Sequence, residues 1–476
     1  MPTFEHTSTY PQSRSEVFAW HTRPGAFVRL TPPGTAEVTQ GPTDGIREGS
    51  RFTLRLSAPL VAALGPSVPL PGLGSGPLGV PWRVVHSEFV EGERFVDEQE
   101  SGPWGQWRHE HIFDDTPEGG TRITDRVTWQ APGPLSSLTS HGPLRTVVET
   151  ALRELFTYRT EQLRADLALH ARASGGPLTV AVSGSTGLIG TQVRALLTSG
   201  GHRVVPMVRG DHAEDGQIAW TPGERLDPGA FDGVDAVVNL AGAPIAGRFT
   251  DDHKKAVLRS RLDSTTTICR AIREADDAPR AIVQASAIGF YGPRRPGELL
   301  SEDSGVGAGF LADVVRQWEG ATLVDEDRTR AVWLRTGIVL TPAGGALPPQ
   351  LPLFRMGVGG RLTDPDSHMS WISLDDMARS YVWALTHEVS GPYNAVADHP
   401  VTSAEFAETL GRVLHRPSAV PVPRLGPTAV LGRQGADEFI ETDQNVSSAR
   451  LRADGFEMTH PRLEQALRHV LLRHHH

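Results

Sequence analysis

The chain has 476 residues, of which 38% are hydrophobic and 21% are charged, and this length and composition predict a globular protein of two or three domains. The net charge of −10 argues against an extended electrostatic contact with nucleic acid or an anionic membrane. The single cysteine, Cys269, excludes an intramolecular disulfide and a multi-cysteine metal site. No apolar run reaches the roughly 18 residues of a membrane span, and no secretory leader is evident, so we expect a cytoplasmic protein.

Residues 1–170 are predicted to form strands followed by one long helix. Runs bounded by Gly, Pro or Asp predict strands at 4–10, 51–56, 82–90, 107–113 and 121–129. The stretch 59–80 is rich in Pro and Gly and predicts a long loop. Apolar residues recur at helical spacing between 143 and 170, so we expect one long helix to pack on an antiparallel sheet.

This order of elements, with the helix start at 16–21, resembles the helix-grip proteins of the START and polyketide-cyclase-like superfamily. The resemblance implies an α+β domain in which a curved sheet wraps the C-terminal helix around an apolar cavity. It also implies a hydrophobic small molecule as the ligand. Core packing is favoured over ligand contact for the aromatic residues Trp82, Trp104, Trp107 and Phe113.

A short flexible linker at 171–177 precedes a second domain in which strands and helices alternate. Apolar runs predict strands at 178–183, 203–208, 236–240, 281–286 and 331–340, and helical patterns lie at 250–276 and 310–325. This alternation predicts an α/β domain at 178–415 with a Rossmann-type, doubly wound parallel sheet. A C-terminal lobe is expected at 416–473, with a final amphipathic helix. We interpret the histidines at 474–476 as a purification tag remnant.

The strand that begins the second domain runs into three glycines and then an amphipathic segment. This order is typical of a dinucleotide pyrophosphate site: Gly184 permits a tight turn, Gly187 lets the backbone approach the phosphates, and Gly190 lets helix and strand pack closely. The N–H groups that begin the helix would face the anion. The predicted cofactor-binding residues here are Gly184, Ser185, Thr186, Gly187, Leu188, Ile189 and Gly190.

The end of the next strand indicates which dinucleotide binds. Arg209 stands where many such folds carry an acid for the ribose hydroxyl, and its guanidinium suits a 2′-phosphate, so NADP(H) is favoured. Asp211 follows closely and keeps NAD as the alternative. A small, polar turn after the strand at 236–240 adds the predicted cofactor contacts Asn239, Leu240, Ala241 and Gly242.

The second half resembles an atypical extended short-chain dehydrogenase/reductase, of the epimerase-like subfamily labelled as sugar-nucleotide epimerases or cell-division-inhibitor homologues. The segments that carry this resemblance are 184–190, 239–245, 260–261, 286–292, 318–319, 334–340 and 370–376. The resemblance covers residues 178 to about 470. It implies NADP(H) contacts by the glycine loop, Arg209 and 239–242, and a C-terminal lobe that receives a small-molecule substrate.

Enzymes of this superfamily transfer hydride with a Ser, a Tyr and a Lys that lowers the pKa of the Tyr. Ser286 occupies the serine strand, but alignment on Glu319 places Leu311 at the tyrosine position and Val315 at the lysine position. Both groups of the usual Tyr-Lys pair are therefore absent. Ser286 and Tyr291, five residues later, are the candidate catalytic residues.

Two other interpretations stay open. In the first, a side chain from a later loop, His368 or Arg361, acts as an acid or binds an anion in an oxidoreductase or epimerase of altered mechanism. Alternatively, the fold binds NADP(H) without turnover, as a sensor or scaffold. The adjacent Asp375 and Asp376 are interpreted as a helix N-terminal cap, and no metal-ligand spacing is recognised.

Overall fold

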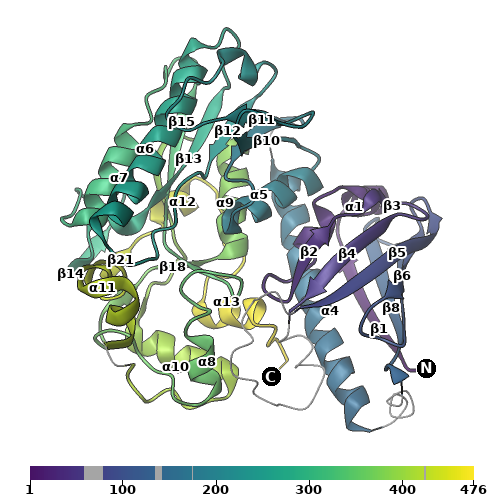
Figure 1. Ribbon diagram of the computed structural model, residues 1–476. Coiled ribbons are helices and arrows are strands. Elements are labelled where there is room, and N and C mark those ends of the chain that lie inside the picture. Colours follow the sequence, from purple (N-terminus) through teal and green to yellow (C-terminus); the bar gives the residue numbers. More distant parts are fainter. Residues whose placement is uncertain (58–78, 134–141, 174, 423–424, 476) are drawn as a thin grey trace. The chain divides into compact units, whose positions relative to one another are not determined.

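The computed structural model describes residues 1–57, 79–133, 142–173, 175–422 and 425–475 (Figure 1). The chain divides into two compact units. The first consists of Met1–Arg172 with Thr198–Gly201 and Leu472–His476, and the second of Ala173–Leu197 with His202–Leu471. Among the described residues, no helix combines the length and the apolar character needed to cross a membrane.

The first unit is built on a seven-stranded sheet with the order β1-β8-β7-β6-β5-β4-β2, and each neighbouring pair is antiparallel. Its strands are β1 (Thr3–Tyr10), β2 (Ala36–Gln40), β4 (Arg51–Leu56), β5 (Val80–Val90), β6 (Arg94–Ser101), β7 (Gln106–Asp115) and β8 (Thr121–Gln130). The five predicted strands are confirmed, whereas β2, β6 and the short β3 (Thr43–Ile46) were not predicted. Residues 59–78 of the loop predicted at 59–80 lie outside the described residues, and Val80 begins β5.

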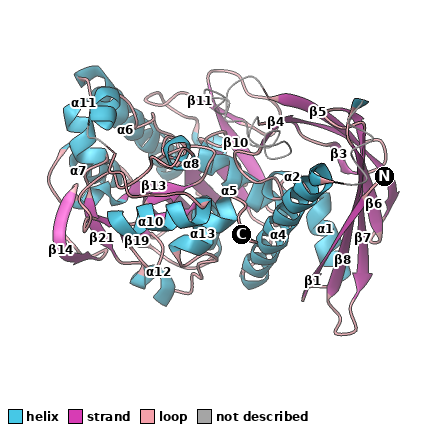
Figure 2. Ribbon diagram, turned by 90° about the horizontal axis from the view of Figure 1, so that it is seen from below, coloured by secondary structure: helices cyan, strands magenta, loops and turns pink. Residues whose placement is uncertain are grey.

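The long helix α4 (Pro143–Arg172) lies against one face of this sheet, as the apolar spacing predicted (Figure 2). It buries Phe156 and Leu163 among the inward side chains of the strands. Helices α1 (Arg14–Thr22) and α2 (Ala26–Arg29) complete the unit. Phe113 is a core residue, in agreement with its predicted packing role, but the three tryptophans Trp82, Trp104 and Trp107 are only partly buried.

The second unit contains a seven-stranded sheet with the order β11-β10-β9-β12-β13-β15-β19, all of whose pairs are parallel. The strands are β9 (Thr179–Ser183), β10 (Arg203–Arg209), β11 (Ile218–Trp220), β12 (Ala236–Asn239), β13 (Ala281–Ala287), β15 (Arg330–Thr336) and β19 (Gly391–Ala395). This order confirms the predicted Rossmann-type sheet. The strand order reverses between β9 and β12, which is where ligands bind in such sheets.

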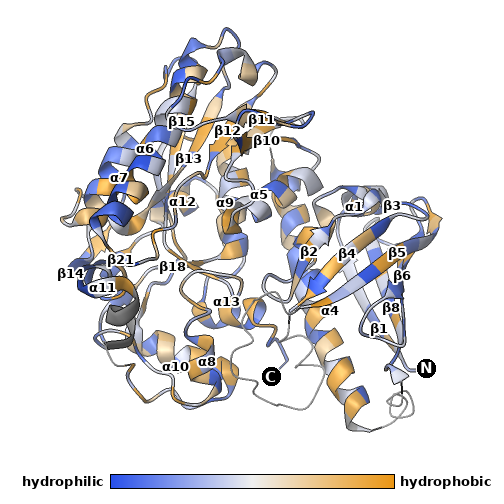
Figure 3. Cartoon of the chain, in the orientation of Figure 1, coloured by the Kyte–Doolittle hydropathy of each residue, from blue (hydrophilic) through white to orange (hydrophobic). Residues whose placement is uncertain are grey.

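Helices cover both faces of this sheet, so its central strands are apolar along most of their length (Figure 3). Helices α6 and α7 lie on one face, and α5 and α9 on the other (Figure 1). Their bounds are α5 (Leu188–Ser199), α6 (Asp251–Glu274), α7 (Phe310–Gly320) and α9 (Leu374–Thr386). Of two short 3-10 helices, η2 (Pro228–Phe231) lies before β12 and η3 (Ile288–Tyr291) follows β13 directly.

A second core in this unit is formed by helices from both sides of residue 415. It joins α8 (Leu351–Arg355), α10 (Ser403–Leu414) and α13 (Leu463–Val470). The predicted apolar stripe of α13 is buried in this core. The remaining elements are β14 (Arg294–Leu300), β16 (Ile338–Leu340), β17 (His368–Met369), β18 (Trp371–Ser373), β20 (Val401–Thr402), α11 (Leu425–Phe439), β21 (Asp443–Val446) and α12 (Ala449–Ala453).

Two local predictions are wrong. The strand predicted at 331–340 is interrupted at Gly337, where a Cβ would lie 2.8 Å from the Ser370 carbonyl oxygen, and the chain passes on to pair with β18. Asp375 and Asp376 do not cap α9, because the Ser373 hydroxyl accepts the N–H of Asp376 at 3.0 Å. Instead, Asp376 is buried in the first turn and accepts the N–H groups of Thr459 and His460 at 2.9 and 3.1 Å.

Candidate cofactor and active site

The glycine loop joins β9 to α5 at the carboxyl edge of the parallel sheet. Gly184 has φ +65°, and a Cβ there would lie 2.9 Å from the carbonyl group of Leu240. Both the backbone angle and the space therefore require glycine. The loop is tightened by a hydrogen bond from the Gly187 N–H to the Gly184 carbonyl at 3.0 Å.

The other two glycines differ in what surrounds them. A Cβ on Gly190 would lie 2.1 Å from the Gly184 carbonyl oxygen, so any side chain would separate the helix from the turn. Gly187 is exposed, and a Cβ there would meet only that oxygen, at 3.3 Å. The backbone at Gly187 is thus accessible, beside the first turn of α5, whose leading N–H groups have no partner within the helix. This geometry suits a bound anion.

Asn239 ends β12, but its side chain is fully buried. Its Oδ1 accepts the Ser183 hydroxyl at 2.6 Å and its Nδ2 donates to Gln284 at 2.9 Å. The same Ser183 hydroxyl accepts the N–H of Leu240 at 3.2 Å. The amide therefore ties three neighbouring strands together and holds the turn 240–242 against Gly184. It positions this turn rather than presenting itself to a ligand.

Arg209 is the last residue of β10 and is exposed. Within the described part of the chain, its guanidinium has neither a hydrogen bond nor an ion pair, and it is available to an anion. The following Gly210 has φ +117°, which turns the chain away from the strand. Asp211, the residue on which the alternative cofactor NAD depends, is also exposed.

The serine strand leads into a buried ion pair. Ser286 donates its hydroxyl to Glu319 of α7 at 2.5 Å, and Glu319 is held by two 2.9 Å hydrogen bonds from Arg335 of β15. The side chains of Arg335 and Glu319 are 5% and 14% exposed, so the pair is largely shielded from water. The hydroxyl of Ser286 is therefore committed to a structural contact in the described conformation.

Tyr291 lies at the end of η3 and is fully buried. Its hydroxyl donates to Asn394 at 2.7 Å and accepts a hydrogen bond from Arg335 at 3.0 Å. Burial raises the pKa of Tyr291, and the nearby charge of Arg335 offsets this only in part. The phenol is thus protonated at neutral pH and fixed by protein partners, which does not favour the acid/base role predicted for it.

The positions of the absent Tyr-Lys pair form an apolar wall. Leu311 and Val315 are buried on α7 and face Gly289 of η3. A Cβ added to Gly289 would lie 3.7 Å from Leu311 and 3.8 Å from Val315.

The two loop residues considered as alternatives lie as follows: His368 is 3.2 Å from the carboxylate of Asp443, and Arg361 is exposed. The network of Glu319, Arg335 and Asn394 was missed from sequence, because its members are far apart in the chain.

Comparison with known proteins identifies relatives of the second unit. The model of the NAD dependent epimerase/dehydratase family matches residues 180–308, and that of a domain of unknown function, DUF1731, matches residues 422–470. Epimerase family protein Mb2239 of Mycobacterium bovis is 38% identical over 62% of this chain and 98% of its own length. Human epimerase family protein SDR39U1 is 35% identical over 62% of this chain and all of its own length.

Solved structures agree. A nucleoside-diphosphate sugar epimerase from Corynebacterium glutamicum has a TM-score of 0.76 at 31% identity, over 99% of this chain and 90% of that chain, so the likeness extends through both units. Human SDR39U1, solved with NADPH, has a TM-score of 0.56 at 34% identity, over 62% of this chain and 99% of that chain. The chain therefore belongs to the NAD-dependent epimerase/dehydratase family, in the atypical short-chain dehydrogenase/reductase group that includes SDR39U1.

Proposed function

We propose that the second unit binds NADP(H) at the point where its strand order reverses. The observation that carries this proposal is the turn at Gly184, which leaves no room for a side chain at Gly184 or Gly190 and exposes the backbone of Gly187 at the start of α5. The pyrophosphate would lie over 184–190, with the turn 240–242 beside it. The NADPH in the structure of human SDR39U1 supports the same cofactor.

Arg209 supports NADP(H) over NAD(H). Its exposed guanidinium has no ionic partner in the described chain, and a forked contact with a phosphate is the interaction that this group makes best. Ribose binding would place the 2′-phosphate at the end of β10. We propose Arg209 as the residue that selects the phosphorylated dinucleotide.

The reaction that we propose is oxidoreductase or epimerase chemistry on a small-molecule substrate, without the Tyr-Lys pair. A second candidate, NADP(H) sensing without turnover, is favoured by a specific observation. Ser286 and Tyr291 are both enclosed by Glu319, Arg335 and Asn394, and neither presents an activated group. Under the first candidate, these residues shape the wall of the pocket and the acid or base comes from elsewhere.

For the first unit we propose a hydrophobic ligand. The support is architectural: an antiparallel sheet carries one long helix across its face, as in the helix-grip proteins that it resembles, and aromatic residues line the interface. The partly buried tryptophans Trp82, Trp104 and Trp107 form one ring cluster, with centroids 5.2 and 5.4 Å apart, which suits an apolar ligand.

Calorimetric titration of the full chain tests the cofactor proposal. We expect NADPH to bind with one site per chain and at least ten times more tightly than NADH. Equal affinity for NADPH and NADH would contradict the proposed role of Arg209. If neither dinucleotide binds, the proposed site is overturned. Consumption of bound NADPH with a panel of carbonyl compounds and nucleotide sugars would then separate the enzyme from the sensor, because a sensor binds NADPH but leaves it unoxidised.

A further inference from the structure

Five titratable side chains meet on the inner face of the sheet in the first unit. The strand register pairs His86 of β5 with Asp97 of β6, and Asp97 with His109 of β7. Two residues along β7, His111 is paired with Asp125 of β8. Because side chains alternate across a strand, His109 and His111 share a face, and the neighbouring strands bring both carboxylates to them. This is the His-Asp cluster.

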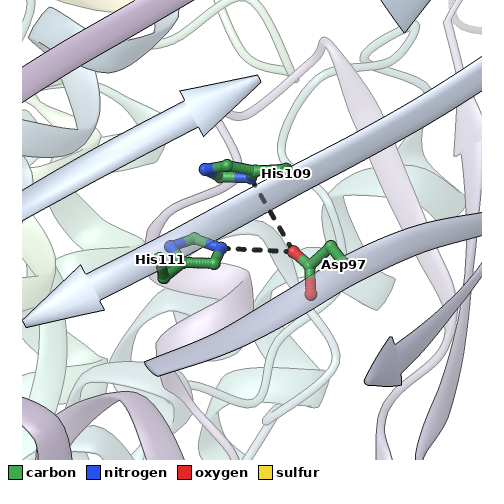
Figure 4. A group of neighbouring side chains, drawn as sticks. All are labelled: Asp97, His109 and His111. Atoms are coloured by element: carbon green, nitrogen blue, oxygen red, sulfur yellow. Dashed lines mark hydrogen bonds and ion pairs between the residues drawn. The ribbon is translucent and has the colours of Figure 1, made fainter. Parts of the chain in front are cut away.

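Three members of the His-Asp cluster converge on one point (Figure 4). His111 Nε2 lies 3.3 Å and His109 Nδ1 lies 3.9 Å from the same carboxylate oxygen, Oδ2 of Asp97. Each of the three residues offers one ligand atom, and these atoms all lie within 4.8 Å of one another. Bonds of about 2.0 Å in a tetrahedral zinc site separate the donors by about 3.3 Å. The observed spacing therefore accommodates an ion after shifts below about 1 Å.

The other atoms of the cluster orient these donors. Asp125 Oδ1 lies 2.8 Å from His109 Nε2 and 2.9 Å from His111 Nδ1, so one carboxylate holds the far nitrogen of both imidazoles. His86 Nδ1 lies 2.7 Å from the second oxygen of Asp97. Metal-binding histidines almost always have such a partner on their other nitrogen, which fixes the ring and raises its basicity.

Hydrogen bonding inside the protein leaves one nitrogen of the cluster without a partner. His86 Nε2 is buried and makes no hydrogen bond to another described residue, whereas Asp97 Oδ1 has its 2.7 Å contact with His86 Nδ1. A buried polar atom without a partner costs free energy, and a network kept for stability alone would be expected to pair it. A cation beside Asp97 would add to the positive charge that Arg159 supplies near the carboxylates of Asp97 and Asp125.

Aromatic rings enclose the site on the protein side. Phe95 stacks on His111 with centroids 4.1 Å apart, and Phe156 of α4 meets the edge of His109 at 5.3 Å. The side chains of His109 and His111 are 4% and 7% exposed, and that of Asp97 is 16% exposed. The rings fix the imidazole planes and lower the local dielectric, while the Asp97 side chain keeps a small area exposed to solvent.

We propose that Asp97, His109 and His111 bind one divalent first-row transition-metal ion, such as Zn²⁺ or Fe²⁺, with Asp125 and His86 orienting the ligands. Imidazole and carboxylate donors suit these ions, and three protein ligands leave coordination positions open. An ion there would lie in the interior of the first unit, where it can polarise a polar group of a bound small molecule.

The test uses the full chain with the histidines at 474–476 removed, because His474 already contacts Glu154 and Glu161 and would bind metal itself. The metal-free protein is titrated with Co²⁺, followed by its visible absorption, and with Zn²⁺, followed by thermal unfolding. We expect one equivalent of Co²⁺ to bind, Zn²⁺ to displace it, and Zn²⁺ to raise the Tm. His109→Ala and Asp97→Asn should each weaken binding at least 100-fold.

Two further variants separate a metal site from a structural network. Asp125→Asn should keep one equivalent of metal but bind it 10- to 100-fold more weakly. His253→Gln is the control, since His253 lies in the second unit, 3.0 Å from the Ile245 carbonyl oxygen, and metal binding by this variant should be unchanged.

Absence of stoichiometric Co²⁺ binding would overturn the proposal, as would binding that survives both His109→Ala and Asp97→Asn. Circular dichroism without metal shows whether the variants fold. If the variants do not fold, anomalous scattering is measured from Zn²⁺-loaded crystals of the protein without these substitutions. A peak between His109 and His111 supports the proposal, and peaks found only elsewhere refute it.

Discussion

Replacing Gly190 by alanine tests the geometry of the cofactor loop most sharply. The added Cβ would lie 2.1 Å from the Gly184 carbonyl oxygen, whereas Cβ atoms essentially never approach closer than 3.0 Å, so the helix and the turn must separate by about 0.9 Å. Overpacking of this kind costs about 1–3 kcal/mol. Because the displaced atoms hold the proposed pyrophosphate site, a similar loss in binding lowers NADPH affinity roughly 10- to 100-fold.

The assay is NADPH titration by fluorescence together with thermal unfolding of the free protein. Gly187→Ala is the informative companion: its Cβ meets only Gly184 O, at 3.3 Å, so the free protein should keep its Tm while NADPH affinity falls. Gly320→Ala, with nothing within 4 Å of its Cβ, should leave both unchanged. Wild-type affinity in Gly190→Ala, or equal Tm losses in Gly187→Ala and Gly190→Ala, would refute this account of the loop.

Three further predictions follow from the described contacts. Arg209→Ala should weaken NADPH binding about 10- to 100-fold and leave NADH binding unchanged, whereas Arg203→Ala, at the other end of β10, should alter neither; calorimetry checks this. Tyr291→Phe removes the hydroxyl that Arg335 and Asn394 share and should cost about 1–3 kcal/mol in chemical denaturation with little change in NADPH affinity; a large loss of affinity would place the phenol at the cofactor instead. Burial tends to raise the pKa of Asp376, but Arg379, His460 and two backbone N–H groups outweigh burial and hold the pKa below its usual value. The ionised carboxylate therefore stabilises the fold above the unfolded pKa of about 4, and this stability is lost as the pH falls through the lower folded pKa. Asp376→Asn should therefore reduce the Tm at pH 7, and an acid-range stability profile as steep as that of the wild type would contradict this reasoning.

The parallel sheet could be predicted because buried strands of this kind are continuous apolar runs. β9 and β12 are almost wholly buried and were located within one or two residues. Strand β6, in contrast, reads Arg-Phe-Val-Asp-Glu-Gln-Glu-Ser and carries no apolar alternation. Its charges are matched by neighbours that lie elsewhere in the sequence, such as Arg108, which donates to Glu98 at 2.8 Å. Cross-strand pairing of this type cannot be read from a single segment.

The candidate site likewise combines features that one segment of the sequence predicts with features that depend on distant segments. The glycine loop and Arg209 are local signals, since each depends on one turn at one strand end. The role of Asn239 as a tie between strands, and the enclosure of Ser286 by Glu319 and Arg335, depend on contacts between distant segments. The His-Asp cluster was not predicted: no metal-ligand spacing was recognised in the sequence, and the carboxylates opposite His109 and His111 depend on the register of three strands.

A crystal structure of the full chain with NADPH tests the central claim most directly. The account predicts the pyrophosphate against the N–H groups of 187–190 at the start of α5, and the 2′-phosphate within hydrogen-bond distance of the Arg209 guanidinium. Nicotinamide density beside Leu311 and Val315, with no titratable side chain within reach of its C4 atom, would favour the sensor over the enzyme. A dinucleotide bound away from 184–190, or a 2′-phosphate that points away from Arg209, would contradict the account.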